Sequence, residues 1–538
     1  MTSNRKKSFL GDVHQEDALS GALKSFQAAV SENRIIQILR PFAVISASSY
    51  SSPMTPPIGP AYLASVLESA GYKTDIIDGI GENLMNLKRS DCGQFNLQGM
   101  SQQEILDRID PKAKVFGISM MFSQEWVFHR ALIQAIKEQR PDLLIVAGGE
   151  HATALPEFVL RDCPEIDYVI AGEGEMAFLG LVHALFYDGD LNSVSGMSYI
   201  DDQNKYVAHL AAKRFSEINS IPWPKWDGIP LENYFIDHWT MGISKGRNMP
   251  IVATRGCPYQ CTFCSNPTMW TTRYVLRTPS DVVDEIEYLI ETYQVNNIDF
   301  YDLTAIVKKD WILQFCDELI RRKIDIEWQL PSGTRSEALD TESLNAIKKA
   351  GCAYLVYAPE SGSERTLISI KKKIDLNRMK KSMKMAKASD ITVKANLIVG
   401  FPDETVLDVV KTYLFAVRMA ILGVDDCNIS LFACYPGSEL FRQLVNKNPD
   451  QDILNDDYFN GLIAQFDMTS SVNFSEKVPK SVLVAVRLLG HASFYSLSYV
   501  LRPLRIAQVV RALLTEKFRP SNLFEQRVFD LFARWKMR

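Results

Sequence analysis

The sequence predicts an α/β protein in which two modules of alternating strands and helices are followed by a helical segment. Its 538 residues are too many for one ordinary domain. Short apolar runs alternate with amphipathic stretches in two separate series, a pattern typical of parallel sheets with right-handed crossovers. Hydrophobic residues make up 46% of the chain and charged residues 23%, as in a globular enzyme.

The first module spans residues 35–185, after a polar stretch, residues 1–34, that we interpret as a leader or an added helix. Its apolar runs predict five strands, at residues 36–48, 73–79, 113–122, 143–151 and 167–175. Amphipathic stretches between them predict helices at residues 58–72, 129–141 and 177–186. This order indicates a doubly wound parallel sheet, which binds ligands at the carboxyl ends of its strands.

Residues 186–245 predict a linker, with a small hairpin at 195–210 and a Pro-rich link at 218–230. A second series occupies residues 246–445, and its strands are expected at residues 250–256, 296–302, 324–333, 353–361, 392–401 and 426–437. Six strand–helix repeats predict a partial (β/α)6 barrel with its chemistry at the strand carboxyl ends. Residues 446–538 are expected to form a helical cap.

Charge and cysteine content narrow the class of protein. The net charge of −5 gives no reason to expect nucleic acid as a partner. The N-terminus has no apolar h-region, and we find no uncharged apolar stretch of about 18 residues, so neither a secretory signal nor a membrane span is predicted. Nine cysteines without export indicate reduced thiols in the cytoplasm. Six are scattered singly and are expected to be buried small hydrophobes: Cys92, Cys163, Cys316, Cys352, Cys427 and Cys434.

The other three cysteines, Cys257, Cys261 and Cys264, lie within eight positions directly after the first strand of the second series. Structural zinc takes four protein ligands, and the nearest histidine is a lone His238 upstream. A disulfide would leave one thiol over and would suit a secreted protein. An iron–sulfur cluster with three protein ligands keeps one iron for another molecule, and we favour this interpretation.

The C-x3-C-x2-C spacing, with Phe263 before the last cysteine, resembles the hallmark of radical S-adenosylmethionine (SAM) enzymes. The resemblance implies a [4Fe-4S] cluster on the three cysteines, with SAM bound to the fourth iron. It further implies reductive cleavage of SAM to a 5′-deoxyadenosyl radical, with an electron donor such as flavodoxin or ferredoxin. The protein's own share of that chemistry is positioning and exclusion of water.

Later stretches resemble the same family over most of residues 250–440. They imply contacts to SAM from residues at strand ends and turns: Phe263, Asp302, Ser332, Arg335, Glu360, Ser361, Gly400 and Pro402. The sequence departs from the family at Ala358, at Asp403 and at the lysine run 371–373, which weakens individual assignments and leaves the cluster unaffected. Taken singly, a Gly-Ser turn or a helix cap would explain several of these residues equally well.

A doubly wound module in front of such a barrel resembles cobalamin-dependent radical SAM enzymes, and residues 56–72, 145–157 and 169–175 carry that resemblance. It implies cobalamin contacts from strand-end residues: Gly59, Ser119, Ser123, Gly148, Gly149, His151, Gly172 and Glu173. Glycines there let the backbone approach a flat macrocycle. His14 lies before the first strand, and His151 is expected to be a polar loop residue near the corrin, so we expect no histidine on the lower face of cobalt.

The resemblance implies methylation of an unactivated carbon in a small-molecule or lipid-like biosynthetic intermediate. One alternative uses the same cofactors for oxidation, as in the anaerobic cyclase of chlorophyll precursors. Another, from a different class, is a cobalamin-binding sensor with a structural cluster. Residues 480–538 carry 11 Lys and Arg against 3 Asp and Glu. This segment predicts helices packed on the barrel, and peripheral contact with anionic lipid is the competing interpretation.

Overall fold

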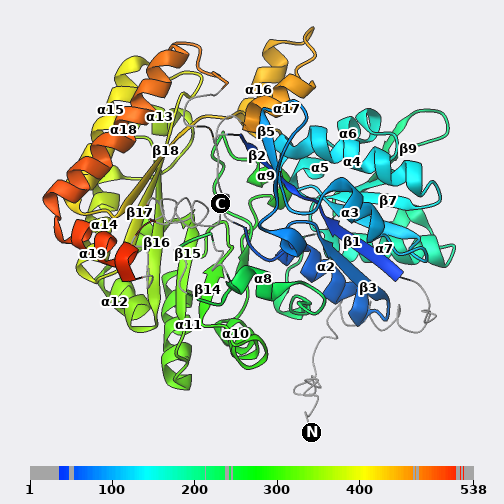
Figure 1. The fold of residues 1–538 in the computed structure, drawn as a ribbon, viewed down its shortest axis with the longest axis horizontal. Coiled ribbons are helices and arrows are strands. Elements are labelled where there is room, and N and C mark those ends of the chain that lie inside the picture. Colours follow the sequence, from blue (N-terminus) through cyan, green and yellow to red (C-terminus); the bar gives the residue numbers. More distant parts are fainter. Residues whose placement is uncertain are drawn as a thin grey trace.

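The computed structural model describes residues 35–47, 54–212, 214–236, 241–243, 246–463, 467, 472–515, 522 and 525. The expected leader, with His14 in it, and His238 lie outside the described residues. Two α/β units lie side by side, with a helical part at the C-terminal end of the chain (Figure 1). The predicted fold class is therefore confirmed.

A seven-stranded sheet forms the centre of the first unit, and five of its neighbouring strands run parallel. In spatial order these are β3 (Lys73–Asp78), β1 (Ile35–Arg40), β6 (Val115–Ser119), β7 (Leu144–Gly148) and β8 (Tyr168–Ile170). The helices of this unit are α2 (Ile58–Ser69), α3 (Gln102–Asp107), α4 (Trp126–Gln139), α5 (Glu150–Ala154), α6 (Pro156–Asp162) and α7 (Gly174–Phe186). The strand order reverses between β1 and β6, and a doubly wound sheet binds its ligand at such a switch point.

Two details of the first unit differ from the expectation. The single strand expected at residues 36–48 is two strands, because Pro41 has no N–H to continue the ladder after β1. The second piece, β2 (Ala43–Ser46), joins β5 (Phe95–Gln98) and β4 (Leu87–Arg89) in a separate antiparallel sheet. The expected hairpin, β9 (Met197–Ile200) and β10 (Tyr206–Ala208), extends the seven-stranded sheet beyond β8.

The second unit has six parallel strands that do not close into a full barrel, since β11 and β18 are not paired in the described part of the chain. In spatial order they are β11 (Asn248–Ile251), β14 (Asn297–Phe300), β15 (Glu327–Thr334), β16 (Cys352–Glu360), β17 (Thr392–Val399) and β18 (Asp426–Leu431). The helices between them are α10 (Pro279–Tyr293), α11 (Lys309–Arg322), α12 (Thr341–Lys349), α13 (Glu364–Ser369), α14 (Leu376–Ala388) and α15 (Val406–Leu422). Short elements complete the unit: α8 (Leu231–Ile236), β12 (Thr254–Arg255), α9 (Asn266–Trp270) and β13 (Val275–Leu276).

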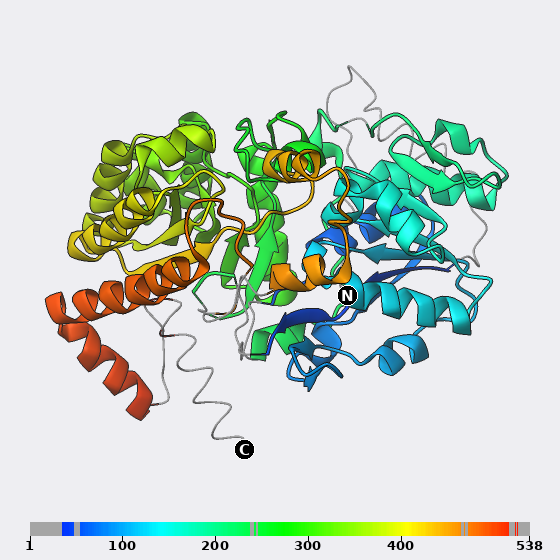
Figure 2. The same cartoon turned by 90° about the horizontal axis from the view of Figure 1, so that it is seen from above.

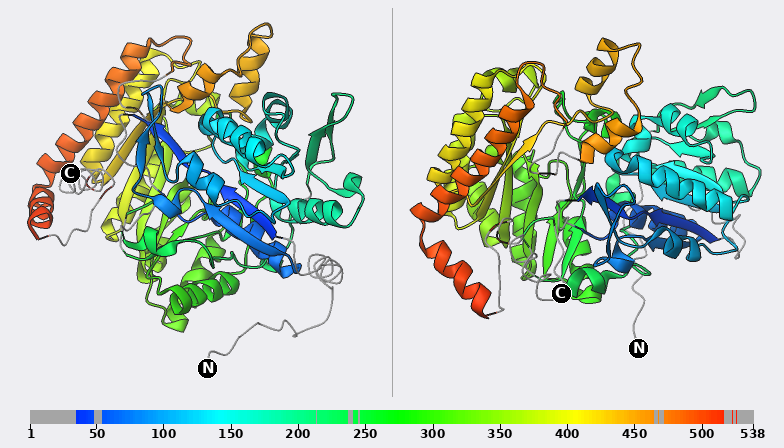
Figure 3. Two further views of the ribbon diagram at one scale, coloured as in Figure 1. Left: turned by 45° about the vertical axis from the view of Figure 1, so that its right-hand side comes forward. Right: turned by 45° about the horizontal axis from the view of Figure 1, so that its top comes forward.

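The C-terminal part consists of α16 (Glu439–Lys447), α17 (Asp456–Ile463), α18 (Lys480–Leu501) and α19 (Leu504–Thr515). Helix α18 lies along α15 on the outside of the barrel, away from the first unit (Figures 2 and 3). By length and composition alone, α18 would be able to cross a membrane, and 28% of its most apolar window is buried. Arg487, which the fold buries, interrupts the apolar run, so this one candidate does not contradict the prediction of no span in the described part of the chain.

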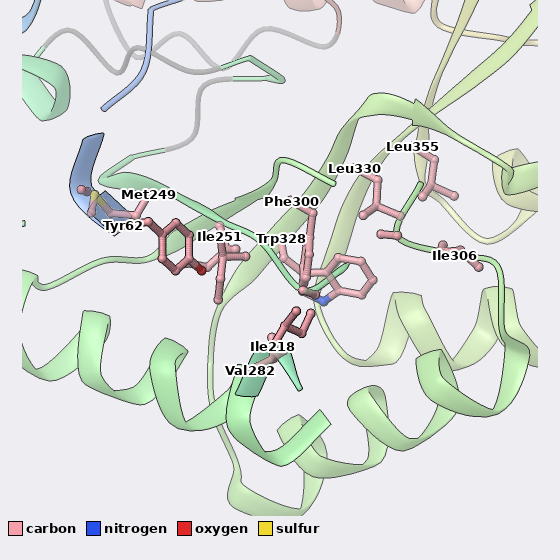
Figure 4. Packing of buried hydrophobic residues seen from close by; sticks show 14 of the residues in the cluster. Tyr62, Ile218, Met249, Ile251, Val282, Phe300, Ile306, Trp328, Leu330 and Leu355 are labelled. Carbon is pink, nitrogen blue, oxygen red and sulfur yellow. The ribbon is translucent and has the colours of Figure 1, made fainter. Parts of the chain in front are cut away.

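One apolar core extends through both units. It joins Tyr62 of α2 and Ile218 of the linker to Met249 and Ile251 of β11. Figure 4 shows these side chains beside Trp328 and its neighbours under the barrel strands. Burial of apolar area is the main favourable term in folding, so this shared core holds the two units together as one packed body.

Candidate cluster and cofactor site

The three-cysteine loop lies between β12 and α9, where the first barrel strand ends and the barrel faces the first unit. Gly256, which precedes Cys257, has φ +84°, and a Cβ there would lie 2.1 Å from the carbonyl oxygen of Arg273. Only glycine fits this position without a backbone shift. The turn into the loop is therefore fixed by the fold itself.

Two backbone hydrogen bonds attach the middle of the loop to later parts of the barrel. Thr262 N–H donates to the carbonyl of Ile370 at 3.0 Å, and Leu440 N–H donates to the carbonyl of Thr262 at 2.9 Å. Ile370 comes after β16 in the chain, and Leu440 comes after β18. The loop is thus held across the carboxyl end of the barrel and presents its thiols there.

All three cysteines of the loop are half-buried and free of disulfides. Burial raises the pKa of Cys264 to about 12, and it also raises the pKa of Cys257 and Cys261. The positive charges of Lys372 and Arg335 act on Cys257 and Cys261 in the opposite direction. Two cations near the thiols are a suitable environment for the thiolates that iron requires.

The donor set fits a cluster better than a single ion. Within the described residues, no three or more His, Cys, Asp or Glu side chains converge closely enough to hold one metal ion. A structural zinc requires such convergence of four ligands. In an iron–sulfur cluster each thiolate binds a different iron, so three separated cysteines suit it.

Phe263 and the turn after β17 lie together next to the cysteine loop. The rings of Phe263 and Phe401 are 5.6 Å apart between centroids. The preceding Gly400 has φ +95°, and its N–H, like that of Phe401, donates to Oε2 of Glu404. The turn that also contains Pro402 is therefore pre-formed beside the loop, with an aromatic surface between them.

Two basic side chains connect the loop to the ends of β15 and β16. The guanidinium of Arg335 stacks 3.8 Å from the ring centroid of Tyr259, which belongs to the loop. Lys372 donates to Oε1 of Glu360 at 2.8 Å, and the two side chains are 10% and 9% exposed. Sequence reasoning missed Tyr259 and Lys372, because a run of three lysines does not indicate which of them is buried.

The remaining residues expected to contact SAM have different surroundings. Asp302 is buried, its Oδ2 accepts from Ala253 N–H at 3.2 Å, and burial raises its pKa to about 6. Ser332 is exposed on β15. Ser361 is fully buried, and its hydroxyl hydrogen-bonds Thr412 at 2.9 Å. We therefore assign Ser361 to helix packing rather than to a ligand.

Glycines at the carboxyl edge of the first sheet differ in the space around them. A Cβ at Gly59 would meet nothing within 4 Å, and one at Gly148 or Gly172 would have only ordinary contacts, at 3.8 Å or more. At Gly149, by contrast, a Cβ would lie 2.5 Å from the carbonyl oxygen of Met120. The first three leave room for a flat ligand, whereas Gly149 does not. The backbone requires glycine at Gly149 and at Gly172, because their φ values are +103° and +87°.

The expectation that His151 is a loop residue is wrong, because the structure has a helix there, while its expected place near the corrin stays a prediction. It belongs to α5, is 1% exposed, and lies between Trp126 and Phe459. Its Nδ1 is 3.0 Å from Oγ of Ser123, and burial lowers its pKa to about 3. The ring is thus enclosed behind the sheet edge.

The edge itself has an apolar surface that the sequence reading missed. Ser119 is half-buried at the end of β6, and the next residues include Met121 and Phe122, which are 48% and 51% exposed. Large exposed apolar side chains beside open glycines fit the face of a macrocycle. The residues present at this edge therefore suit cobalamin.

Glu173 lies between the two units rather than at an open edge. Its carboxylate accepts from Arg255 at 3.1 Å, from Arg214 at 2.9 Å and from Phe215 N–H. Arg255, two residues before Cys257, also pairs with Glu175 at 2.5 Å. With both oxygens engaged, Glu173 connects the cysteine loop to the first sheet, and we no longer assign it to cobalamin.

The scattered cysteines follow the expectation with one exception. Cys163, Cys316, Cys352, Cys427 and Cys434 are buried. Cys92 is exposed, with its Sγ 3.3 Å from the hydroxyl of Ser90 in a turn. The prediction for Cys92 is wrong, because a short turn sequence offers no neighbours that would bury it.

Comparison with known proteins agrees with this geometry. The family model of the radical SAM superfamily matches residues 251–416, and that of the B12 binding domain matches residues 51–182. The anaerobic magnesium-protoporphyrin IX monomethyl ester cyclase of Rubrivivax gelatinosus is 29% identical, over 73% of this chain and 67% of its own. The cytidylyl-2-hydroxyethylphosphonate methyltransferase of Streptomyces wedmorensis is 28% identical, over 76% and 82% respectively.

Among solved structures, the fold resembles that of the radical SAM methyltransferase TsrM from Kitasatospora setae, with cobalamin and a [4Fe-4S] cluster bound. The TM-score is 0.64 at 16% identity, and the match covers 85% of this chain and 91% of that one. With both domain types present in this order, and with the fold shared over most of its length, the chain belongs to the cobalamin-dependent radical SAM enzymes.

Proposed function

We propose that the protein methylates an unactivated carbon of a small-molecule or lipid-like biosynthetic intermediate. The observation that carries the proposal is the position of the cysteine loop directly against the carboxyl side of the first sheet. Ser265, next to Cys264, donates to Glu150 of α5, and a Cβ at Gly172 would lie 4.0 Å from the carbonyl oxygen of Met269 in α9. When bound, the cluster with SAM supplies a carbon-centred radical, and cobalamin supplies the methyl group.

On the barrel side, we propose that Cys257, Cys261 and Cys264 hold three irons. The aromatic surface of Phe263 with the Gly400–Pro402 turn would accept the adenine of SAM. Glu360, Ser332 and Arg335 lie at the ends of the neighbouring strands and would orient the rest of the molecule. Lys372 holds Glu360 at 2.8 Å and so sets the direction of that carboxylate. Asp302 supports the first strand end through Ala253 N–H.

On the other side, we propose that the corrin lies on Met121 and Phe122, with Gly59, Gly148 and Gly172 leaving room for it. Ser119 would hydrogen-bond a side chain of the macrocycle. His151 is turned into an aromatic core, which supports cobalamin binding without a protein nitrogen on the cobalt. The electron paramagnetic resonance spectrum of bound cob(II)alamin should then show no nitrogen superhyperfine splitting. Splitting that disappears in His151→Ala would contradict the assignment.

A second reaction merits a direct comparison, because the cyclase relative is as similar as the methyltransferase relative. The same cofactors would then oxidise or cyclise a substrate without methyl transfer. The mass of the product separates the two, since methylation adds CH2. A cobalamin-binding sensor with a structural cluster is the alternative from a different class. It predicts no 5′-deoxyadenosine when reconstituted protein receives SAM and a reductant.

For partners, we propose a flavodoxin or ferredoxin as electron donor and a cytoplasmic location, with no role for nucleic acid. Peripheral contact with a membrane would give access to a lipid-like substrate. The decisive experiment is anaerobic reconstitution with iron, sulfide and cobalamin, followed by SAM carrying a labelled methyl group. We expect 5′-deoxyadenosine in wild type and none in Cys261→Ala. Label that never leaves SAM when candidate substrates are added would reject the methyl-transfer proposal.

A further inference from the structure

The outward face of α18 has no charged residue, although the helix is 22 residues long. Its two charged residues are Lys480 at the start and Arg487, which is 4% exposed. The solvent-facing positions recur at helical spacing: Ala485, Leu488, Leu489, Ala492, Ser496 and Val500. Leu489 is 59% exposed and Val500 is 74% exposed. A helix on a water-facing surface normally carries charges on that side.

Helix α15, which packs alongside α18, extends the apolar surface. Its exposed apolar positions Leu407, Val410, Leu414 and Ile421 fall on one side of the helix, where Lys411 and Arg418 are exposed among them. Leu407 and Ile421 are 63% and 58% exposed. Both helices thus carry exposed leucine, valine or isoleucine side chains, and Figure 3 shows the two helices side by side on the outside of the barrel. Such a group differs from the scattered apolar residues of an ordinary surface.

A basic strip borders this apolar surface. Helices α14 and α15 both pack against strand β17. The exposed side of α14 carries Arg378, Lys381 and Lys384, and none of them forms an ion pair within the described part of the chain. Each therefore keeps its charge available for an external partner.

We propose that the outer sides of α14, α15 and α18, which we call the outer helix face, dock on an anionic lipid surface. Apolar side chains that enter the headgroup boundary, bordered by lysine and arginine, are the pattern of an interfacial helix. Basic residues near an anionic leaflet contribute further to binding. A symmetric dimer through the same face would instead bring the two basic strips toward each other, which disfavours a second copy as the occupant.

The position of this face connects it to the active site. Helix α15 starts six residues after Gly400, and a Cβ at Gly400 would lie 2.9 Å from Cδ1 of Leu483 in α18. Both helices therefore begin beside the turn that we assign to SAM. Docking would place that end of the barrel next to lipid. The idea that docking gives access to a lipid-like substrate rests on the proposed function, whereas the docking itself does not.

The test is co-sedimentation of the full-length holoenzyme with vesicles. One set contains equal parts of phosphatidylglycerol and phosphatidylcholine, and the other contains phosphatidylcholine alone. We expect binding to the anionic set, and about a five-fold loss for each basic residue removed. The charge variant is R378Q/K381Q/K384Q, and its control is K73Q/K88Q/K112Q on the first unit. The apolar variant is Leu489→Glu, and its control is Leu210→Glu, at an apolar residue that is 88% exposed.

The proposal is supported if wild type and both controls bind anionic vesicles, while the charge variant and the apolar variant bind weakly and keep the circular dichroism of wild type. Equal binding of all variants, or no binding to anionic vesicles, would overturn the proposal. A dimer in sedimentation equilibrium without lipid that Leu489→Glu converts to monomer would assign the face to a second copy. In each of those cases, 5′-deoxyadenosine formation from SAM still reports on the proposed function separately.

Discussion

Gly149→Ala tests whether glycine at this position is required by the backbone conformation or by contact with the corrin. Gly149 has φ +103°, and a Cβ there would be 2.5 Å from the carbonyl oxygen of Met120. The backbone conformation costs about 1–3 kcal/mol for a residue other than glycine. The contact with a main-chain atom adds about 1–3 kcal/mol of overpacking, because it cannot be relieved by a rotamer change.

The effect of the substitution through the unfolded state is stabilising, and it is smaller than the two destabilising effects on the folded state. Replacing glycine by alanine restricts the unfolded chain and stabilises a protein by about 0.4–1 kcal/mol. The net effect is therefore a loss of roughly 1–5.5 kcal/mol, with a midpoint of about 3 kcal/mol. With about 2–4 °C per kcal/mol for a unit of this size, the first thermal transition should fall by roughly 10 °C.

The assay is a thermal scan of protein prepared without cobalamin, with Gly148→Ala as the matched control. A Cβ at Gly148 would meet only the carbonyl oxygen of Ile170, at 3.8 Å, so its melting temperature should change by less than about 3 °C. We expect Gly148→Ala to weaken cobalamin uptake instead. An unchanged melting temperature in Gly149→Ala, combined with loss of cobalamin binding, would refute the backbone explanation and indicate direct contact with the corrin.

Three further predictions follow from single residues. Cys264→Ala should abolish the visible charge-transfer band of the cluster and the ~4 Fe bound per chain. The control Cys316→Ala should keep both and lose about 1–3 kcal/mol of packing energy. Iron retained without Cys264 would contradict the assignment. Arg255→Met should destabilise the protein by about 3–5 kcal/mol, because the buried carboxylate of Glu175 loses its ion-pair partner and Glu173 keeps only Arg214 and Phe215 N–H; an unchanged melting temperature would speak against this. Burial raises the pKa of Glu125 from its ordinary value of 4.5 to about 8, so the free energy of unfolding should fall as the pH rises between these values. Glu125→Gln should flatten this fall, and an equal dependence of the free energy of unfolding on pH in both proteins would count against the assignment.

The two strand–helix series were predictable because apolar runs and amphipathic stretches report local periodicity directly. The break at Pro41 was missed although proline signals it, since the apolar residues on both sides read as one strand. The association of β9 with β8 depends on contacts between distant segments, which periodicity does not contain. The same reason explains why β2, β4 and β5 form a sheet that the sequence did not suggest.

The candidate site shows the same limit at the level of side chains. The three cysteines were predictable from spacing alone, because their chemistry requires neighbours in sequence. The roles of Ser361 and Glu173 were not, since both residues lie in glycine-containing turns that suit a ligand and a packing contact equally. Lys372 was hidden for a related reason, as only its pairing with Glu360 distinguishes it from the adjacent lysines.

Buried charges fix how the two cofactor regions face each other. Arg255 is two residues before Cys257, and its partners Glu173 and Glu175 follow the carboxyl end of β8. An apolar interface tolerates small slips, because dispersion contacts are individually weak. A slip here would leave the guanidinium of Arg255 and the carboxylate of Glu175 buried without each other, although Glu173 would keep Arg214, at a cost of several kcal/mol. The ion pairs therefore select one arrangement of the cysteine loop against the first sheet, and a methyl group carried on one side can reach a radical formed on the other only in a fixed arrangement.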